Sequence, residues 1–444
     1  MSKHNLKNAY RFEREGWVYL HIEGEPFERG YQHGYYLSDE LTQIYRNLKY
    51  LTYIDTGKDW DFFVESARDL FVKHMDDEYI EEMKGIAKGA SDHGCSVTWE
   101  EILAWNGYDE LTQYWWPGER RRMFNTYEHR RKEHCSAFIA TKPFTVTGEI
   151  IMAHNTWARY ETGQFSNLII DIKPKEGHRI FMQSSPGYID SFSDYFVTEA
   201  GIMGTETTIG DFSMYDADEV PEFHRARKAM QYGESIDDFV KRMLKQNSGG
   251  YANSWLLADT NTGEIARFEL GLKYYNVERK KDGYFVGYNA AEDPRIRNLE
   301  CADSGFFNVK RAQGARRVRL TELMEQYKGE IDIEVGKKVL SDHFDPYLQK
   351  ENPCGRTIEG HHELDDSKYT TYTPFEPKGS VDGKVTSSSL AKELSFDARW
   401  GSSSGMEFDA NEFLKQHPQW DYLRNYLFDR PTKEWSQFGV GEKK

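Results

Sequence analysis

The spacing of apolar residues divides the chain into helical and extended segments. An alternating strand is predicted at 17–23, and the pattern becomes helical from residue 26 onward. Apolar residues three and four positions apart predict further helices at 59–74, 77–90 and 98–114. Thr98 followed by Glu101 is typical of a capping box at the start of the last of these helices. The N-terminal part of the chain is therefore expected to be mostly helical.

After residue 134 the pattern changes to short, largely apolar strands, which are typical of sheets covered on both faces. These strands are expected at 135–141, 149–154, 167–172, 179–183, 195–198, 202–208, 254–260, 264–270, 273–277, 284–289, 384–390 and 394–400. Helices are expected between 222 and 245 and at 309–327 and 333–342, and a loop at 352–382. Because neither block of strands has a partner sheet of its own, this order favours one α+β body over separate domains.

Cys135 stands where a polar, basic segment, 120–132, meets the first of these strands. A nucleophile in that position predicts an enzyme that cuts its own chain between His134 and Cys135 and frees an α-amine beside the thiol. Such an amine titrates at roughly 7.7 to 8.0 and can act as the base for the thiol. The alternative is that Cys135 is a buried small apolar residue, which is the usual role of a free cysteine.

Four motifs in this order resemble the phospholipase B-like proteins. They are Cys135-Ser136-Ala137, Ala153-His154-Asn155-Thr156-Trp157, Ser184-Ser185-Pro186-Gly187-Tyr188 and the segment 247–255, which ends in Asn253-Ser254-Trp255. Upstream, Gly30-Tyr31-Gln32-His33-Gly34 resembles the opening of the wider acyltransferase family (peptidase C45) that includes the penicillin-forming acyl-CoA transferase. The resemblance runs from about residue 17 to about residue 400.

The resemblance implies an N-terminal-nucleophile hydrolase with a four-layer αββα fold. Self-cleavage would leave a helical fragment, 1–134, and a nucleophile-bearing fragment, 135–444, that together remain one globular body. The implied chemistry is hydrolysis of acyl esters or amides, and the resemblance implies fatty-acyl deacylation of glycerophospholipids. Two alternatives stay open: an amidase or acyltransferase acting on small N-acyl compounds, and a self-processed binding protein without turnover.

The resemblance also assigns roles within the site. Asn253 resembles the asparagine that donates to the oxyanion, and His154 and Trp157 occupy positions in the active-site wall. Strand alternation places His154 and Asn155 on opposite faces, so these residues cannot all contact one substrate if the strand continues through them. For His154 an orienting role and a core role stay open, and Asn155 is the next candidate donor.

For the other candidate residues, an ordinary structural role stands as the alternative to a functional role. Asp190 and Asp194 could bind the free α-amine or cap a turn, and Arg297 could bind a substrate anion or be solvated. Cys354 lacks the linker-to-strand context of Cys135 and is expected to be structural. Neighbouring histidines at 361 and 362 point in different directions, so no metal site and no cofactor are predicted.

The composition limits the classes of molecule that this protein is expected to bind. A formal charge of −16 argues against a nucleic-acid partner, and no apolar stretch approaches the roughly 18 to 20 residues that span a bilayer. Four cysteines are too few for a disulfide framework. The first residues lack the apolar region of a signal peptide, so we expect a soluble protein that is cytoplasmic, or secreted or lysosomal if a leader has been removed. The expected substrate is a small-molecule or lipid acyl compound, and the oligomeric state stays open.

Overall fold

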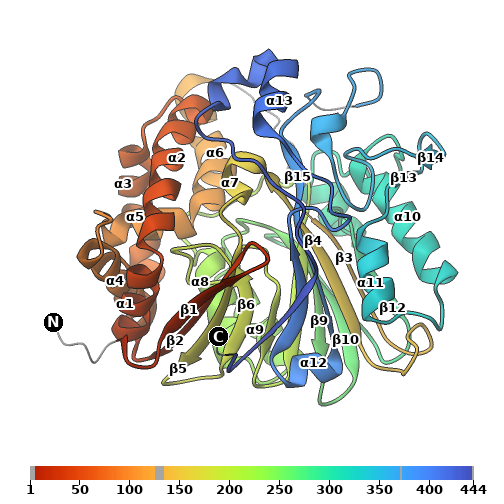
Figure 1. Ribbon diagram of the computed structural model, residues 1–444, viewed down its shortest axis with the longest axis horizontal. Helices are drawn as coiled ribbons and strands as arrows, with labels where there is room; N and C mark the ends of the chain where they lie inside the picture. Colours follow the sequence, from red (N-terminus) through yellow and green to blue (C-terminus); the bar gives the residue numbers. More distant parts are fainter. Residues whose placement is uncertain (1–5, 126–134, 371–372, 443–444) are drawn as a thin grey trace.

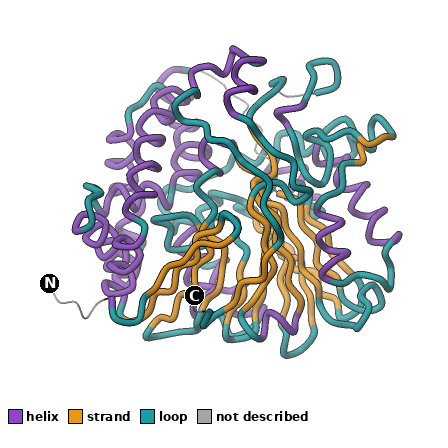
Figure 2. Tube along the Cα trace, viewed as in Figure 1, coloured by secondary structure: helices purple, strands orange, loops and turns teal. Residues whose placement is uncertain are grey.

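The computed structural model spans residues 1–444 and describes all of them except 1–5, 126–134, 371–372 and 443–444. The predicted cleavage junction at His134 therefore lies outside the described residues. The described chain forms a mixed α+β structure built on two large sheets (Figures 1 and 2). Within its described parts, no helix combines the length and apolar character needed to cross a bilayer.

The larger sheet has nine strands. In spatial order they are β1 (Tyr10–Arg14), β2 (Trp17–Gly24), β5 (Leu168–Pro174), β6 (Ile180–Ser184), β7 (Phe196–Thr198), β8 (Ile202–Thr208), β9 (Asn253–Asp259), β10 (Glu264–Leu270) and β11 (Tyr275–Lys280). Neighbouring strands are antiparallel except β2 and β5, which run parallel with Val18 opposite Leu168. A parallel pair needs a long crossover. Here the crossover contains the N-terminal helices and the first strands of the second sheet.

The second sheet has six strands and carries the candidate nucleophile. Its order is β12 (Tyr284–Gly287), β3 (Cys135–Ala140), β4 (Ile151–Arg159), β15 (Lys378–Ser387), β16 (Ser395–Trp400) and β17 (Ser436–Gly439). All of its neighbouring strands are antiparallel, and Cys135 lies opposite Thr156. A separate two-stranded ribbon pairs β13 (Phe344–Asp345) with β14 (Lys350–Glu351).

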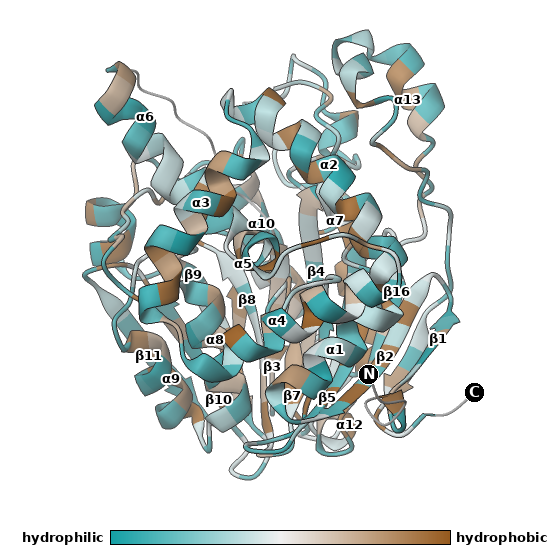
Figure 3. Cartoon of the chain, turned by 90° about the vertical axis from the view of Figure 1, so that its left-hand side faces the viewer, coloured by the Kyte–Doolittle hydropathy of each residue, from teal (hydrophilic) through white to brown (hydrophobic). Residues whose placement is uncertain are grey.

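The helices lie along the outside of the two sheets and in an N-terminal layer. They are α1 (Pro26–Tyr36), α2 (Ser38–Thr56), α3 (Trp60–Phe71), α4 (Asp77–Asp92), α5 (Trp99–Asn106), α6 (Trp116–Phe124), α7 (Tyr160–Gly163), α8 (Glu222–Tyr232), α9 (Ile236–Leu244), α10 (Ala312–Gln326), α11 (Ile333–Leu340), α12 (Ser388–Lys392) and α13 (Ala410–Gln416). Apolar and polar positions alternate along the N-terminal helices, as expected for helices that bury one face (Figure 3).

Three apolar clusters show how sheets and helices pack. Between the sheets, residues such as Ala137 of β3 and Leu256 of β9 share one cluster. The other face of the nine-stranded sheet packs against α8 and α9, with Phe239 in the contact. The other face of the six-stranded sheet packs against α10 and α11, with Leu320 and Val339 in the contact. Both sheets are thus covered on both faces, which explains their largely apolar strands.

The N-terminal helices pack against parts of the chain that follow residue 134. Their apolar cluster, which includes Phe63 and Trp105, also contains Phe165, Tyr188 and Phe223. The Trp105 indole donates to the carbonyl of Pro186 at 3.0 Å. Together with the β2–β5 pairing, this shared core joins the two sides of residue 134 into one body.

The glycines of the 30–34 motif allow α1 and α4 to cross closely. A Cβ on Gly30 would lie 2.0 Å from the carbonyl oxygen of Glu82, and one on Gly34 would lie 1.9 Å from that of Ile86. Only a residue without a side chain fits at such a crossing. The motif therefore has a packing role here, since it sets the distance between two helices of the N-terminal layer.

Most predicted elements are confirmed, and several boundaries were wrong. The capping box of Thr98 and Glu101 is present, and the strands expected at 254–260 and 264–270 are β9 and β10, which pair as an antiparallel hairpin. However, β4 does not end at residue 154 but continues to Arg159, and β15 begins at Lys378 inside the predicted loop. Residues 388–392 form α12 instead of extending a strand. Small and charged residues in the fully buried β15 hid its strand character, and the short hairpin strand β1 was missed.

Candidate active site

Cys135 is the first residue of β3 and is buried, with 1% of its surface exposed. Its backbone nitrogen donates to Asn289 Oδ1 at 3.2 Å, and its carbonyl oxygen accepts from the Arg316 guanidinium. Arg316 also donates to Asn289 Oδ1 at 2.8 Å and to Ser136 Oγ at 3.1 Å. The backbone on both sides of the Cys135 side chain is therefore fixed by two side chains from outside its strand.

The Cys135 sulfur faces the nine-stranded sheet, where Glu206 of β8 is its charged neighbour. Glu206 Oε1 lies 4.0 Å from Cys135 Sγ and accepts from the Tyr251 hydroxyl at 3.3 Å. In the amide orientation that matches donors to acceptors, Asn253 Nδ2 donates to Glu206 Oε2 at 2.7 Å and to the Ala252 carbonyl at 3.1 Å. The structure thus brings Asn253, at the start of β9, to the carboxylate beside the sulfur.

Burial dominates the electrostatics of this pair. It raises the pKa of the Cys135 thiol well above its usual range, and the Glu206 carboxylate raises it further, whereas the backbone of Trp157 and the Lys384 ammonium lower it. Burial also raises the pKa of Glu206 to about 8, despite the hydrogen bonds from Tyr251 and Thr208. The thiol is therefore protonated near neutral pH and needs a base to become a nucleophile.

A buried lysine lies on the strand next to β4. Lys384 of β15 is fully buried, donates to Thr156 Oγ1 at 2.6 Å and forms an ion pair with Asp382. Asp382 also accepts from the backbone nitrogen of Thr156 at 3.3 Å. Burial lowers the pKa of Lys384, and the Asp382 carboxylate opposes that shift. This pair places a positive charge behind Thr156, the residue opposite Cys135.

The 153–157 motif contributes to two different surfaces, because β4 continues through it. His154 and Thr156 point between the sheets, where the His154 ring lies 6.1 Å from that of Tyr195. Burial, followed by the Lys384 charge, lowers the pKa of His154 well below its usual range, so the ring is neutral. Among the described residues, neither ring nitrogen has a hydrogen-bond partner, so His154 is not a satisfied core histidine, and its orienting role stays a prediction.

Asn155 and Trp157 point the other way. Asn155 Nδ2 donates to the carbonyls of Leu340 and Ile358, at 2.8 and 3.2 Å, and its Oδ1 accepts from Ser403. The Trp157 ring is buried beneath the Arg316 guanidinium, whose carbon lies 4.1 Å from the ring centre. Asn155 therefore holds loops together, and Trp157 supports the arginine that binds the Cys135 carbonyl.

Asp190 and Asp194 line a separate acidic pocket with Glu110, Glu222 and Tyr251. Burial raises the pKa of each aspartate well above its usual range, which disfavours two charged carboxylates there. The residue placed against the Cys135 nitrogen is Asn289 instead. Tyr251 joins the pocket to the nucleophile, because its hydroxyl donates to Glu206.

The remaining candidates lie away from Cys135. Arg297 donates to the carbonyls of Ala291 and Glu292, at 3.1 and 2.8 Å, and stacks over Phe306. All four cysteines, including Cys354, are free thiols. His361 belongs to a cluster with His343 and Glu359, whereas the sequence offered only its neighbour His362 as a partner and predicted no metal site there.

Sequence reasoning missed five residues around Cys135. They are Glu206, Asn289, Arg316, Asp382 and Lys384. Charged residues inside the buried strands β8 and β15 were the available signal, because burial of a charge is costly unless it has a partner or a function. Asn289 had no comparable signal in the sequence, because its φ of +64°, in the left-handed region that is uncommon for residues other than glycine, is seen only in the structure.

The raised pKa of Glu206 predicts a pH effect on stability. Between pH 4.5 and about 8 the folded state keeps a proton on Glu206 that the unfolded chain has released, so the free energy of unfolding should fall as the pH rises. Glu206→Gln is neutral throughout and should flatten that fall. Denaturation midpoints measured from pH 5 to 8.5 test this. The two proteins compared are Cys135→Ala and the double variant Cys135→Ala with Glu206→Gln, because Cys135→Ala prevents cleavage in both. Identical pH slopes with and without Glu206→Gln would contradict the assignment.

Comparison with known proteins assigns the chain to a family. Residues 31–270 match the family model described as Phospholipase B, which is more than half of the chain. The chain therefore belongs to the phospholipase B family. The matched residues include Cys135, His154, Glu206 and Asn253, whereas Asn289, Arg316 and Lys384 follow them.

Curated relatives agree with this assignment. Phospholipase B of Crotalus adamanteus is 28% identical over 292 residues, which are 59% of this chain and 50% of that protein. An uncharacterized protein of Archaeoglobus fulgidus is 26% identical over 258 residues, 55% of this chain and 41% of that one. Phospholipase B-like 1 of Homo sapiens is 28% identical over 188 residues, 37% and 34% of the two chains. The chain thus spans half or less of the length of these relatives.

Proposed function

We propose that this protein is a self-processing hydrolase with an N-terminal cysteine nucleophile, and that it removes fatty-acyl groups from glycerophospholipids through a cysteinyl acyl-enzyme. One observation carries the proposal: the backbone nitrogen of Cys135 is held by Asn289, and its sulfur lies beside Glu206 and Asn253. The order of helix, sheet, sheet and helix layers supports the four-layer fold of this hydrolase class. The phospholipid substrate rests on the names of the relatives.

Processing would use the same thiol as catalysis. Cys135 Sγ attacks the carbonyl carbon of His134, the peptide C–N bond breaks, and the nitrogen gains a proton. A thioester then joins the His134 acyl group to the sulfur, and water hydrolyses it. The products are a carboxylate on His134 and a free amine and thiol on Cys135. Asn289 Oδ1 is already placed to accept a hydrogen bond from that amine.

The free amine would supply the base that a buried thiol needs. It takes the proton from Sγ, the thiolate attacks the ester carbonyl, and Asn253 donates to the oxyanion that forms. The resulting ammonium gives its proton to the departing alkoxide, leaving the acyl group on sulfur as a thioester. Water, deprotonated by the same amine, hydrolyses this thioester and releases the fatty acid. No cofactor is needed for these steps.

We expect purified protein to separate into fragments 1–134 and 135–444 under denaturing conditions while eluting as one body under native conditions. The fragments should stay together because β2 pairs with β5 and the N-terminal helices share a core with Phe165 and Tyr188. Intact-mass spectrometry after incubation at mildly acidic and neutral pH measures the cleavage. A chain that stays at full length under all conditions would contradict self-processing.

A substrate panel separates phospholipid hydrolysis from its alternatives. Glycerophospholipids and N-acyl amino acids are offered to the processed protein, with and without an acceptor amine, and products are read by mass. Free fatty acid from the phospholipids supports the proposal. Products from N-acyl compounds alone would identify an amidase, a new amide would identify an acyltransferase, and processing without any product would indicate a binding protein.

A further inference from the structure

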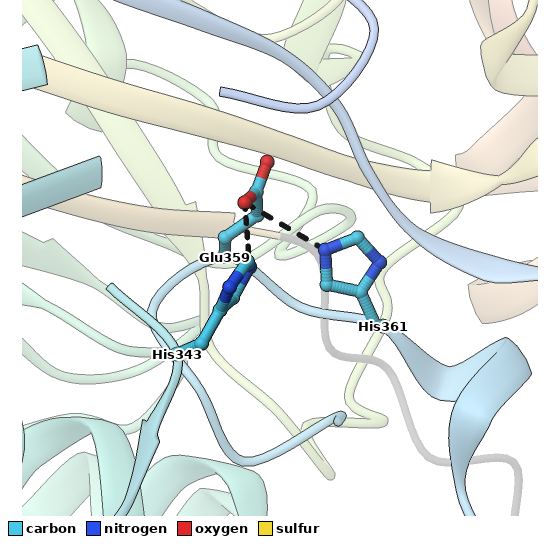
Figure 4. A group of neighbouring side chains, drawn as sticks. All are labelled: His343, Glu359 and His361. Carbon is cyan, nitrogen blue, oxygen red and sulfur yellow. Dashed lines mark ion pairs between the residues drawn. The ribbon is translucent and has the colours of Figure 1, made fainter. Parts of the chain in front are cut away.

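Two imidazoles and a carboxylate converge in the loops that precede β15. His343 lies just before β13, and Glu359 and His361 precede β15 (Figure 4). His343 Nε2 lies 2.7 Å from Glu359 Oε2, and His361 Nε2 lies 3.7 Å from the same oxygen. One donor atom from each side chain thus falls within 4.8 Å of the others. These residues lie outside the 31–270 family match.

The His361 ring is oriented as a metal ligand would be. Its Nδ1 lies 2.8 Å from Glu363 Oε1, so that carboxylate takes the Nδ1 hydrogen and directs Nε2 toward Glu359. Within the described residues, the buried Nε2 makes no hydrogen bond. A histidine whose second nitrogen is held by a carboxylate is the usual arrangement in metal sites.

The carboxylate is also positioned from outside the cluster. Glu359 is fully buried, and the backbone nitrogen of Ser404 donates to its Oε1 at 3.0 Å. The other oxygen, Oε2, faces both histidines. Glu359 and Glu363 place two carboxylates beside the His361 ring, and their negative charge favours a cation at this point.

We propose that His343, Glu359 and His361 bind a divalent transition-metal ion, with Zn²⁺ as the best match to two imidazole nitrogens and one carboxylate oxygen. Zinc accepts this ligand set at about 2.0 to 2.2 Å, with water completing a tetrahedron. His343, whose side chain is 14% exposed, leaves a route for that water and for the ion. The His343 and Glu359 side chains would spread slightly apart to hold one ion between them.

The expected role is structural. The loop that carries Glu359 and His361 is bound to β4 by the Asn155 hydrogen bond to Ile358. A Cβ on Gly360 would lie 2.3 Å from the Trp157 ring, which shows how closely this loop packs on the tryptophan beneath Arg316. An ion at the three ligands would fasten this loop to the segment that carries His343, behind the candidate active site. The proposal does not depend on the hydrolase activity.

Calorimetric titration of the chelator-treated full-length protein with Zn²⁺ tests the site. We expect one ion per chain and a higher melting temperature with Zn²⁺, but no comparable effect of Mg²⁺. Glu363 would hold the His361 ring without touching the ion, so Glu363→Gln should weaken Zn²⁺ binding by about 10- to 100-fold. His361→Gln and His343→Gln each remove a ligand and should weaken Zn²⁺ binding by more than that. His362→Gln is the matched control, because the Nδ1 of that neighbouring ring pairs with Asp365 instead; it should keep parental affinity.

Circular dichroism of each variant shows whether it is folded, and His343→Gln decides the test if His361→Gln does not fold, since His343 is partly exposed. The Co²⁺ complex provides an independent readout, because a thiolate ligand would add a charge-transfer band that this ligand set lacks. Three results would overturn the proposal. They are a lack of stoichiometric Zn²⁺ binding, a thiolate band in the Co²⁺ complex, and parental Zn²⁺ affinity in the folded His361→Gln and His343→Gln variants. The cluster would then be a group of ion pairs without a metal.

Discussion

Replacing Cys135 with alanine is expected to abolish both chain cleavage and acyl hydrolysis. Alanine keeps the small volume of a buried site and the backbone bond to Asn289, but it removes the only sulfur that lies beside Glu206 in the described structure. Removal of a covalent nucleophile leaves at most the residual rate from binding and oxyanion stabilisation, a loss of roughly 10³-fold or more. Intact mass and fatty-acid release, measured on the same preparation, check both effects.

Two further variants separate chemistry from packing. Cys135→Ser should still process slowly, because a hydroxyl can perform the same acyl shift with a weaker nucleophile. Cys354→Ala should keep parental cleavage and turnover, since the Cys354 sulfur lies 3.6 Å from Asp345 and burial raises its pKa to about 12. Parental activity in Cys135→Ala would remove the mechanism proposed here, and loss of activity in Cys354→Ala alone would move the nucleophile to that residue.

Asn253→Ala is expected to slow acylation of Cys135 by about 10²- to 10³-fold, or roughly 3 to 4 kcal/mol of transition-state stabilisation, with little change in substrate affinity. In the structure the Asn253 amide donates to Glu206 and to the Ala252 carbonyl. In the proposed role one of its hydrogens turns to the oxyanion. A purely structural role predicts instead a stability loss of about 1 kcal/mol with normal acylation. Single-turnover acylation and melting temperature on one processed sample distinguish the two.

Asn253→Asp provides the second comparison. A carboxylate at position 253 would face the Glu206 carboxylate, whose Oε2 lies 2.7 Å from Nδ2 of Asn253, and also the forming oxyanion. Acylation of Cys135 should therefore be slower in Asn253→Asp than in Asn253→Ala. Asn247→Ala is the matched control from the same motif: its amide donates to the Gly271 carbonyl at 2.7 Å, so it should lower stability and leave acylation unchanged. Parental acylation in Asn253→Asp would show that the donor lies elsewhere.

The periodicity of apolar residues predicted most of the fold because burial follows it directly. The capped helix after Thr98 and the β9–β10 hairpin follow from contacts within a few residues. The strand at 17–23 was also predicted, but its first six residues are all buried because it pairs with β5, far away in the sequence. The extent of β15 could not be predicted in this way. Its buried Asp382 and Lys384 satisfy each other and Thr156 across the sheet, so a strand with a polar sequence is fully buried.

The residues of the candidate site also fall into those that the sequence indicated and those that only the structure shows. Motif order gave Cys135 and Asn253 as candidates, and the fold brings both to the same carboxylate from different sheets. Glu206, Asn289 and Arg316 reach Cys135 only through pairing and packing between segments far apart in sequence. Asp190 and Asp194, which could have bound the α-amine or capped a turn, lie in the neighbouring acidic pocket. Proximity in sequence to a motif does not set which side chain meets the backbone of β3.

The most direct test of the central claim is to trap the acyl-enzyme on the processed protein. A slowly hydrolysed fatty-acyl ester is added, the reaction is stopped in acid, and peptides are mapped by mass spectrometry. The mechanism predicts an acyl group on the peptide whose first residue is Cys135, with a free α-amine and a thioester that hydroxylamine removes. An acyl group on another residue, or turnover of the ester by a chain still joined at His134 and Cys135, would contradict it.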